Sequence, residues 1–460
     1  MLTQGQTRWS IPPSFVMQDS SLLGALAQAL LAGEPTVDLL VYRCSRTLGK
    51  SWRWVRPLAL RYVEKFGAGT RPRYREVVRF LRDDAGLQRA RSKYSDELLV
   101  REVLIAPPRM LPAAAAEEWK LPAIDSPGDL AKWLGLDSGE LRWFADLKAL
   151  GYKRSGEQLR HYHYRILAKR FGSVRLIEAP KPRLKDLQRQ ILQWILEEVP
   201  PHPAVHGFVK GRSIKTFVAA HVGQRVVLRM DVRDFFPTFG GVRIQNLFRT
   251  LGYPEAAADL LGGICTNATP RDVWNGIAAD LGPVCVGEAR RLYARPHLPQ
   301  GAPTSPALAN ISFYRLDCRL AALAKSAGAS YTRYADDLAF SGGEAFEKGV
   351  EHFGLQVAAI LLEEGFAVNH RKTRVMRQGV RQHLAGLVTN QRPNIVRRDF
   401  DRLKAVLTNC VRLGPESQNR ERRPRFRAHL EGRVAFVEMV TPNKGKRLRE
   451  ILERIRWAEY

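Results

Sequence analysis

The sequence is poor in cysteine and in long apolar runs. Its five cysteines are an odd number and contain no Cys-x-x-Cys pair, which argues against a disulfide framework and against a cysteine zinc site. The longest apolar run, residues 22–33, contains Gln28 and is about 12 residues long, whereas a membrane span needs roughly 20. The N-terminus has no charged segment followed by an apolar core, so we expect no signal peptide. We therefore expect a cytoplasmic protein that has no membrane partner.

Acidic residues are also scarce relative to basic ones. The chain has 46 Asp and Glu against 73 Lys and Arg, a formal net charge of +27. Such an excess opposes compaction by self-repulsion unless a polyanion usually covers the surface. Nucleic acid is therefore the first partner to expect, and an anionic membrane the second. The hydrophobic content of 45% excludes a disordered or fibrous chain, and 460 residues predict about two to four domains.

One concentration of this charge lies in residues 43–79, which contain eleven Lys or Arg and only two Glu. Three aromatic residues are interleaved with them, namely Trp52, Trp54 and Tyr62. Basic side chains for phosphates and aromatic faces for bases are typical of nucleic-acid binding. Arg53 and Arg56 are therefore candidate RNA contacts. The alternative is a solvated basic face whose aromatic residues point into a helical core.

Composition divides the first half of the chain into segments. Residues 1–106 are expected to form a mainly helical N-terminal extension, for which RNA binding is one candidate role. Residues 107–128 are rich in Pro and Ala and are expected to be a linker. Two alternating stretches between residues 164 and 178, joined by a turn that contains Gly172, predict a β-hairpin. Helical spacing of apolar residues follows from Leu184 to Leu196.

Carboxylates occur at the ends of two predicted strands. The apolar stretch 226–230 runs into Asp231, and a carboxylate there is costly unless a cation meets it. Asp336 and Asp337 lie between two alternating segments, where successive strand residues point to opposite faces. Only one of them can therefore face the same metal as Asp231, unless the turn twists the other round. Carboxylates from separate strands that clamp two Mg²⁺ ions are the arrangement for in-line phosphoryl transfer.

Together with a polar loop at residues 298–306, these segments resemble the palm of a reverse transcriptase, and they are most similar to the bacterial retron and group II intron families. The motifs are Asp-x-x-x-Phe-Phe-Pro at 231–237, Leu-Pro-Gln-Gly-x-Pro-Thr-Ser-Pro at 298–306 and Tyr-Ala-Asp-Asp at 334–337. Two further blocks match at 206–213 (His-Gly-Phe-x-x-Gly-Arg-Ser) and 365–373 (Gly-Phe-x-x-Asn-x-x-Lys-Thr). The resemblance covers about residues 155–400.

The resemblance implies an α+β fold shaped as a right-hand polymerase. Its parts would be fingers at 129–225, a palm with an antiparallel sheet at 226–388, and a basic helical thumb at 389–460. The catalytic and metal-binding carboxylates would be Asp231, Asp336 and Asp337, with Asp231 and Asp336 the firmer pair. Val232 would be a further residue of the metal site. The cofactor would be two Mg²⁺ ions, which Mn²⁺ could replace.

Other roles also follow from the resemblance. Phe236 would exclude a ribose 2′-OH, Gln300 would touch the incoming sugar, and Lys372 would be a general acid for pyrophosphate. Further nucleotide-binding candidates are Lys169, Arg170, Arg175, Asp234 and Phe235. The alternatives are a core Phe for Phe236, surface solvation for the hairpin cations and a structural role for Lys372.

The thumb segment has its own charge excess. Residues 391–460 contain 18 Lys or Arg and nine Asp or Glu, which suits a helix that lies along a nucleic-acid backbone. Candidate RNA contacts are Arg212, His221, Arg397 and Arg398, and the expected primer grip is Leu384, Ala385 and Gly386.

Two segments depart from the retron pattern. Retron enzymes typically carry Asn-Ala-x-x-His before the first catalytic Asp and Val-Thr-Gly in the thumb region. Here these become Phe217-Val218-Ala219-Ala220-His221 and Leu384-Ala385-Gly386. Recognition of RNA in the usual retron way is therefore open, and His221 is either an RNA contact or a packing residue.

The leading hypothesis is the RNA-directed DNA polymerase of a retron, similar to the larger, N-terminally extended myxobacterial enzymes. By resemblance it would bind its own structured non-coding RNA, prime from an internal 2′-OH and make a branched RNA–DNA hybrid for phage defence. Its other partners would be dNTPs, a host RNase H and an effector protein. The alternatives are a retron-like or group II-like enzyme with a different RNA and priming route, and a catalytically idle RNA-binding scaffold.

Overall fold

The chain forms two compact units in the computed structural model. One unit comprises Met1–Leu147 with Gln245–Ile264, and the other comprises Lys148–Ile244 with Cys265–Tyr460. These two units do not follow the expected boundaries between extension, fingers and palm. The segment Gln245–Ile264, which lies between the motifs at 231–237 and 298–306, packs with the N-terminal part of the chain. The structure describes residues 19–67, 72–104, 110–112, 114–116, 118–153, 160–168, 174–275 and 283–457. Within these residues, no helix has the length and apolar character needed to cross a membrane.

The first unit begins with a helical bundle. Its helices are α1 (Asp19–Leu31), α2 (Val37–Leu48), α3 (Val55–Phe66), α4 (Tyr74–Asp83) and α5 (Ala85–Lys93). Trp52 and Tyr62 are only 9% and 2% exposed and belong to the core of this bundle, while Trp54 packs against it. Buried rings cannot stack on bases, so the alternative interpretation of the aromatic residues in 43–79 is the one that the structure favours.

Several cations of residues 43–79 bond to partners within the same unit. The Arg61 guanidinium donates to both carboxylate oxygens of Asp84, at 2.6 and 2.9 Å. Arg43 is buried and donates to the carbonyls of Ala29 and Glu34. The other pairs are Arg46 with Glu102, Lys50 with Glu97, Arg56 with Asp38, and Arg73 with Asp259. Arg53 is exposed. Much of this positive charge is therefore compensated inside the unit.

The remaining elements of the first unit pack around the inserted segment. They are η1 (Ala114–Ala116), α6 (Pro127–Leu134), α7 (Ser138–Ala145) and α13 (Glu255–Cys265), with the C-terminal part of α12 (Gly241–Thr250). The Leu111 amide donates to the Gly252 carbonyl at 2.9 Å, and the Tyr74 amide donates to the Glu255 carboxylate at 3.0 Å. Part of the expected linker at 107–128 is thus bonded to the unit.

The second unit contains the predicted hairpin. β1 (Tyr162–Ala168) pairs antiparallel with β2 (Val174–Pro180), from Tyr162↔Pro180 to Ala168↔Val174. The predicted hairpin is confirmed; its turn, with Lys169, Arg170 and Gly172, lies outside the described residues. The neighbouring elements are α8 (Leu150–Lys153), α9 (Pro182–Ile191), the π-helical turn η4 (Leu192–Leu196), η5 (Arg271–Trp274) and α15 (Pro283–Leu292).

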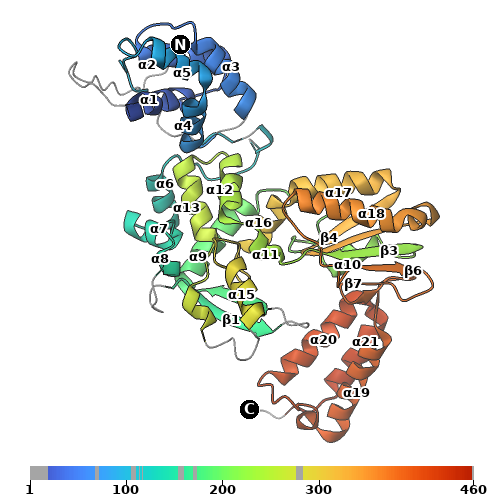
Figure 1. Ribbon diagram of the computed structural model, residues 1–460. Helices are drawn as coiled ribbons and strands as arrows, with labels where there is room; N and C mark the ends of the chain where they lie inside the picture. The colour runs from blue at the N-terminus through green and yellow to red at the C-terminus, as the bar shows by residue number, and fades with distance from the viewer. Residues whose placement is uncertain are drawn as a thin grey trace. The chain divides into compact units, whose positions relative to one another are not determined.

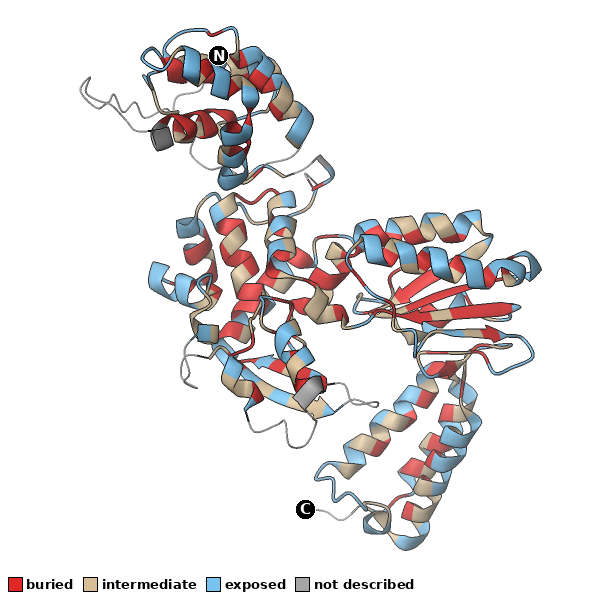
Figure 2. Cartoon of the chain, viewed as in Figure 1, coloured by how far each residue is buried: buried red, intermediate tan, exposed pale blue. Residues whose placement is uncertain are grey.

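A four-stranded antiparallel sheet forms the centre of the second unit. Its strand order is β4-β5-β3-β6, with β3 (Val226–Asp231), β4 (Ala329–Tyr334), β5 (Asp337–Gly342) and β6 (Arg374–Arg377). Helices α17 (Tyr314–Ser326) and α18 (Glu344–Glu363) cover one face (Figure 1). Phe217 of α10 (Ile214–Ala219) packs with Val227 and Ala339 on the other. Two short helices begin within the motifs at 231–237 and 298–306, namely α11 (Phe235–Thr238) and α16 (Ser305–Ser312). The central strands are buried (Figure 2).

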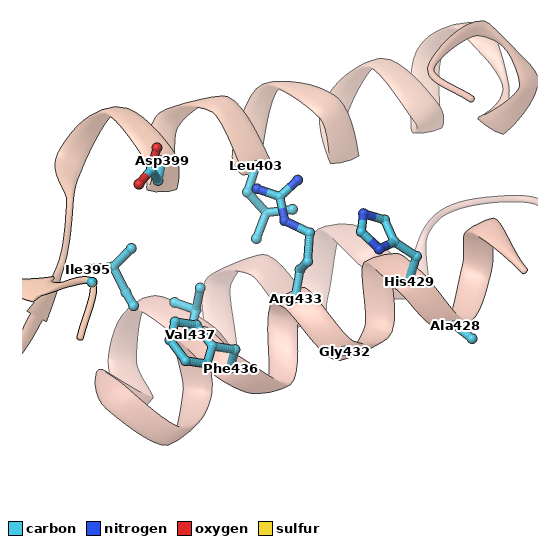
Figure 3. A pocket seen from close by; sticks show the side chains of 10 residues that line it. Ile395, Asp399, Leu403, Ala428, His429, Gly432, Arg433, Phe436 and Val437 are labelled. Atoms are coloured by element: carbon cyan, nitrogen blue, oxygen red, sulfur yellow. The ribbon is translucent and has the colours of Figure 1, made fainter. Parts of the chain in front are cut away.

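The chain then enters a three-stranded sheet and a helical segment. The strands are β7 (His383–Leu384), β8 (Leu387–Val388) and β9 (Asn394–Ile395). The helices are α19 (Arg397–Leu413), η6 (Pro415–Ser417), α20 (Phe426–Val440) and α21 (Pro442–Glu453). A pocket between α19 and α20 is lined by Leu403 and Asp399 on one side and by His429, Arg433 and Phe436 on the other (Figure 3). These helices match the helical character expected for residues 389–460.

Candidate active site

Three aspartates meet at one end of the four-stranded sheet. Asp231 is the last residue of β3, and its register partner is Asp337, the first residue of β5. Directly opposed residues of antiparallel strands point to the same face. A two-residue turn of Ala335 and Asp336 joins β4 to β5, and Ala335 has a positive φ of 54°. The strand register thus pairs Asp231 with Asp337, and Asp336 lies in the adjoining turn; the expectation that Asp231 and Asp336 are the firmer pair of metal carboxylates stays a prediction.

Two cations neutralise two of these carboxylates. The Lys372 ammonium lies 2.8 Å from Oδ2 of Asp231. The Arg229 guanidinium donates to Oδ1 of Asp337 at 2.7 Å and to its Oδ2 at 2.9 Å. Among the residues that the structure describes, none forms such an ion pair with Asp336. Burial and then the neighbouring charges of Asp231 and Asp337 raise the pKa of Asp336 to about 6. The three groups are therefore close enough to repel one another.

The donor chemistry of this site suits a hard divalent cation, because Mg²⁺ prefers carboxylate oxygens. Among the residues that the structure describes, however, no group of three or more His, Cys, Asp or Glu is arranged to hold a metal ion. Lys372 and Arg229 already contact the oxygens that a metal would use. A divalent cation would therefore bind in competition with these two side chains.

Backbone hydrogen bonds hold the acidic end of the sheet together. The Val232 amide donates to the Asp336 carbonyl at 2.9 Å, and the Asn369 amide donates to the Asp231 carbonyl at 2.7 Å. Val232 is buried, and it forms an isolated bridge with Val368. The block at residues 365–373 is thereby joined to the strand that ends in Asp231.

The two phenylalanines after Asp231 lie in different environments. Phe235 is buried, with its ring centroid 5.1 Å from that of Phe239, so it is a core residue. Phe236 is only partly buried. Asp234, with φ 46°, precedes both at the start of α11 and lies 3.3 Å from Arg233. Phe236 is thus the member of the pair that a nucleotide could touch.

The Gln300 loop is bonded to β2. The Glu178 amide donates to the Gln300 carbonyl at 2.9 Å. The buried Glu178 carboxylate in turn contacts His297 Nε2 at 2.8 Å and accepts from Asn267 and Thr269. Burial alone would lower the pKa of His297, but the Glu178 carboxylate outweighs it and raises that pKa. Arg175 is exposed on the same strand, β2.

Phe208 lies near Phe236 and Tyr334, although the sequence motif that contains it did not single it out. Its ring is 53% exposed, and its φ is 60°, which is unusual for a bulky residue. The ring centroid lies 6.4 Å from that of Phe236 and 6.3 Å from that of Tyr334. The ring thus lies near the acidic turn, which is the β4–β5 turn of Ala335 and Asp336. The place of Phe208 in the block at 206–213 was the sequence signal that could have indicated this.

Two of the candidate RNA contacts are engaged within the protein. His221 is fully buried, with its Nδ1 2.6 Å from Ser341 Oγ and its Nε2 2.7 Å from Thr332 Oγ1. Burial lowers the pKa of His221 to about 3. RNA cannot reach this ring in the folded protein, so His221 is a packing residue here. Arg212 donates to the carbonyls of Pro203 and Val205.

The other candidates lie at the surface or in a turn. Arg397 has a side chain that is 95% exposed, and Arg398 is exposed beside it. Leu384 is buried and pairs with Leu387. Ala385 and Gly386 form the two-residue loop between them, with φ of 45° and 84°. Two positive φ angles are those of a type I′ turn, which explains the glycine.

Comparisons with known proteins agree with this architecture. The family described as reverse transcriptase (RNA-dependent DNA polymerase) matches residues 167–393. The retron Mx65 reverse transcriptase of Myxococcus xanthus is 41% identical over 339 residues, which are 73% of each chain. The chain belongs to the retron reverse transcriptases. The retron Mx162 enzyme of the same species is 40% identical over 71% of this chain and 66% of its own.

This reverse transcriptase is therefore an RNA-directed DNA polymerase, and the resemblance to myxobacterial retron enzymes is confirmed. The retron Ec86 reverse transcriptase of Escherichia coli is more distant, at 29% identity over 60% of this chain and 74% of that protein. The expected α+β polymerase fold with a helical N-terminal region is likewise confirmed. The matched residues 167–393 include the three aspartates and the Gln300 loop.

Proposed function

We propose that this retron reverse transcriptase copies part of a cognate structured non-coding RNA into DNA by in-line phosphoryl transfer at Asp231, Asp336 and Asp337. The observation that carries the proposal is the convergence of these three carboxylates at one end of the central sheet. Two divalent ions, Mg²⁺ or in its place Mn²⁺, would supply the positive charge that such a transfer needs.

We propose roles for the remaining residues as well. Lys372 bonds to Asp231 and its side chain is half exposed. Its ammonium would donate a proton to the departing pyrophosphate. Arg175 would meet phosphate oxygens. The partly buried ring of Phe236 would fill the space of a ribose 2′-OH and so favour deoxynucleotides. Gln300 would touch the sugar, with its backbone held by Glu178.

The priming and product are part of the same proposal. Synthesis would begin from a 2′-OH inside the RNA and give a branched RNA–DNA hybrid that takes part in phage defence. A host RNase H would trim the product, and an effector protein would act with it. The family membership supports this route over a different RNA or priming site.

The test is Mg²⁺-dependent dNTP incorporation on a primed RNA template. Asp231→Asn, Asp336→Asn and Asp337→Asn should each lower kcat by on the order of 10²–10³-fold, because each removes a charge that holds the transfer centre. Binding of the RNA should persist. Asp186→Asn, on the exposed face of α9, is the matched control and should retain full activity.

Two results would contradict the proposal. Incorporation that survives the combined change Asp336→Asn and Asp337→Asn would exclude the assigned carboxylates and favour another catalytic centre, whereas no incorporation by the wild-type protein would favour an RNA-binding scaffold. The nucleic acid that copurifies with the wild-type protein tests the product. We expect RNA covalently linked to DNA, and RNA with no linked DNA would favour a different priming route.

A further inference from the structure

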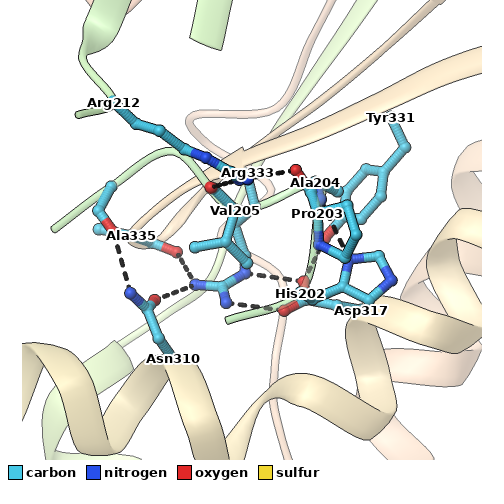
Figure 4. A network of polar contacts seen from close by, with 11 residues as sticks. His202, Pro203, Ala204, Val205, Arg212, Asn310, Asp317, Tyr331, Arg333 and Ala335 are labelled. Carbon is cyan, nitrogen blue, oxygen red and sulfur yellow. Dashed lines mark hydrogen bonds and ion pairs between the residues drawn. The ribbon is translucent and has the colours of Figure 1, made fainter. Parts of the chain in front are cut away.

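A fully buried ion pair lies behind the acidic turn. Arg333 and Asp317 are both inaccessible to solvent. The guanidinium donates from Nε to Asp317 Oδ1 at 2.8 Å and from Nη2 to Oδ2 at 2.7 Å. Its Nη1 donates to Asn310 Oδ1 at 3.0 Å and to the Ala335 carbonyl at 3.2 Å (Figure 4). One side chain thus connects α16 and α17 with the β4–β5 turn.

Arg333 reaches this turn from the face opposite the carboxylates. Side chains alternate along a strand. Tyr334 pairs with Asp337 and therefore shares its face, so Arg333 points the other way, toward α17. Its contact within the turn is the carbonyl of Ala335, the residue with positive φ. The guanidinium can therefore act on the aspartates only through the backbone.

The same network also holds the block that contains Phe208. The Arg333 amide donates to the Ala204 carbonyl, and the His206 amide donates to the Arg333 carbonyl, each at 2.8 Å. Asn310 Nδ2 donates to the Gly207 carbonyl at 2.9 Å. A Cβ on Gly207 would lie 2.6 Å from the Ala335 nitrogen. The segment before Phe208 is thus packed directly on the acidic turn.

Stability alone does not explain this arrangement. Burying a charge pair costs desolvation, and apolar residues of similar size often fill such a site as stably or more so. An apolar pair could not, however, donate to both the Ala335 carbonyl and Asn310. The planar guanidinium can do so while bonding Asp317 in two places. The ion pair therefore differs from an apolar pair in that it can hold the β4–β5 turn in a fixed position.

We propose that Arg333, held by Asp317, is a positioning residue for DNA synthesis. It fixes the Ala335 turn and through it the Asp336 carboxylate, and through Asn310 it keeps the Phe208 segment in register with that turn. The proposal rests on the role proposed above for Asp336. It makes the Tyr331–Asp337 segment of the hairpin and residues 204–208 one rigid unit during nucleotide addition.

The decisive variant is the double substitution Arg333→Met with Asp317→Leu, which fills the space with apolar side chains. We expect an RNA affinity close to that of the wild type. The variant leaves no buried charge unpaired, but the Tyr331 hydroxyl, Asn310 Oδ1 and the Ala335 carbonyl lose their partners, so the melting temperature should fall. The rate constant measured in a single turnover should fall on the order of ten- to a hundredfold, because small misplacements of reacting groups slow a reaction by such factors. The KM for dNTPs should change little. Wild-type kcat in the folded double variant would overturn the proposal.

A second variant keeps the test decisive if the double variant does not fold. Asn310→Ala leaves the ion pair intact and removes the bonds that connect Arg333 through Asn310 to the Gly207 carbonyl. It should lower kcat severalfold without a matching loss of RNA affinity. Wild-type kcat in folded Asn310→Ala would overturn the proposal. Failure of both variants to fold would assign the network to folding alone and would overturn it as well.

Two controls distinguish a failure of the positioning role of Arg333 from a failure of the proposed catalytic role of Asp336. Arg319→Met removes an arginine two residues beyond Asp317 on α17, whose partners are Glu363 and Glu364, and it should retain kcat. Asp336→Asn is assayed in parallel. If Asp336→Asn abolishes synthesis while the double variant keeps wild-type kcat, only the positioning proposal fails. If Asp336→Asn is fully active, the proposed function fails.

Discussion

At the scale of single residues, two buried histidines respond to pH in opposite ways. His221 contacts the hydroxyl groups of Ser341 and Thr332, and burial holds its pKa near 3. His297 contacts the buried carboxylate of Glu178, so its pKa is raised instead. His297 therefore contributes stability that is present at low pH and is lost as the pH rises through its folded pKa. His221 has the reverse effect.

The effect of His221 can be measured. An unfolded histidine has a pKa of about 6.5, so below that pH the unfolded chain binds a proton that folded His221 does not. The free energy of unfolding should fall as the pH drops, by up to about 1.4 kcal/mol per pH unit. Between pH 7 and 5, His221→Gln should lose about 2 kcal/mol less than the wild type in urea unfolding. Equal losses in the two proteins would show that His221 is protonated in the fold.

At the scale of elements, the site depends on loops that are bonded to strands. The Gln300 loop lies against β2, where Gly301 has φ 137° and a Cβ on it would lie 2.8 Å from the Glu178 carbonyl oxygen. Any side chain at this position is therefore both strained and crowded. The strand that carries Arg175 and the loop that carries Gln300 are in this way held in one arrangement.

Gly301→Ala should accordingly disturb nucleotide use. We expect kcat/KM for dNTPs to fall on the order of ten- to a hundredfold, because Gln300 would be displaced from the nucleotide. The matched control is Gly349→Ala on α18, where an added Cβ meets no atom within 4 Å and alanine favours the helix. Unchanged dNTP kinetics in Gly301→Ala would remove Gln300 from the nucleotide site.

At the scale of the whole molecule, the net charge of +27 is concentrated in two segments whose cations differ in their partners. From sequence, residues 43–79 and 391–460 carry equal excesses, and both would be expected to hold RNA. In the structure, Arg46 and Arg61 of the first cluster are bonded to Glu102 and Asp84. Arg397 of the second cluster has a long contact of 3.7 Å with Asp401, and its side chain is 95% exposed. The second cluster is therefore the better candidate for phosphate contacts.

This difference predicts two distinct phenotypes. Arg397→Gln with Arg398→Gln should weaken RNA binding and reduce the slope of log affinity against log salt by about 1.4–1.8, the value for two phosphate contacts. Arg46→Gln with Arg61→Gln should lower the melting temperature and leave the slope unchanged. Salt titration of RNA binding, with thermal unfolding in parallel, measures both. The opposite assignment of the two phenotypes would return RNA binding to residues 43–79.

The sequence by itself determined the features that depend on near neighbours. The alternation around residues 164–178 predicts the hairpin, and the motifs at 231–237, 298–306 and 334–337 identify the family. These features could be read because strand period, turn residues and short motifs are local properties of the chain.

Only the tertiary structure decided the rest, because the deciding partners are far apart in sequence. The register of β3 with β5 placed Asp337 opposite Asp231 and left Asp336 in the turn. Packing buried His221 and Trp52, and it paired cations whose exposure the composition could not show. The bonds from Arg333 to Asp317, Asn310 and Ala335 exist only once the helices lie on the sheet. Burial and pairing depend on folded neighbours, and that is why the sequence could name the aspartates but not what holds them in place.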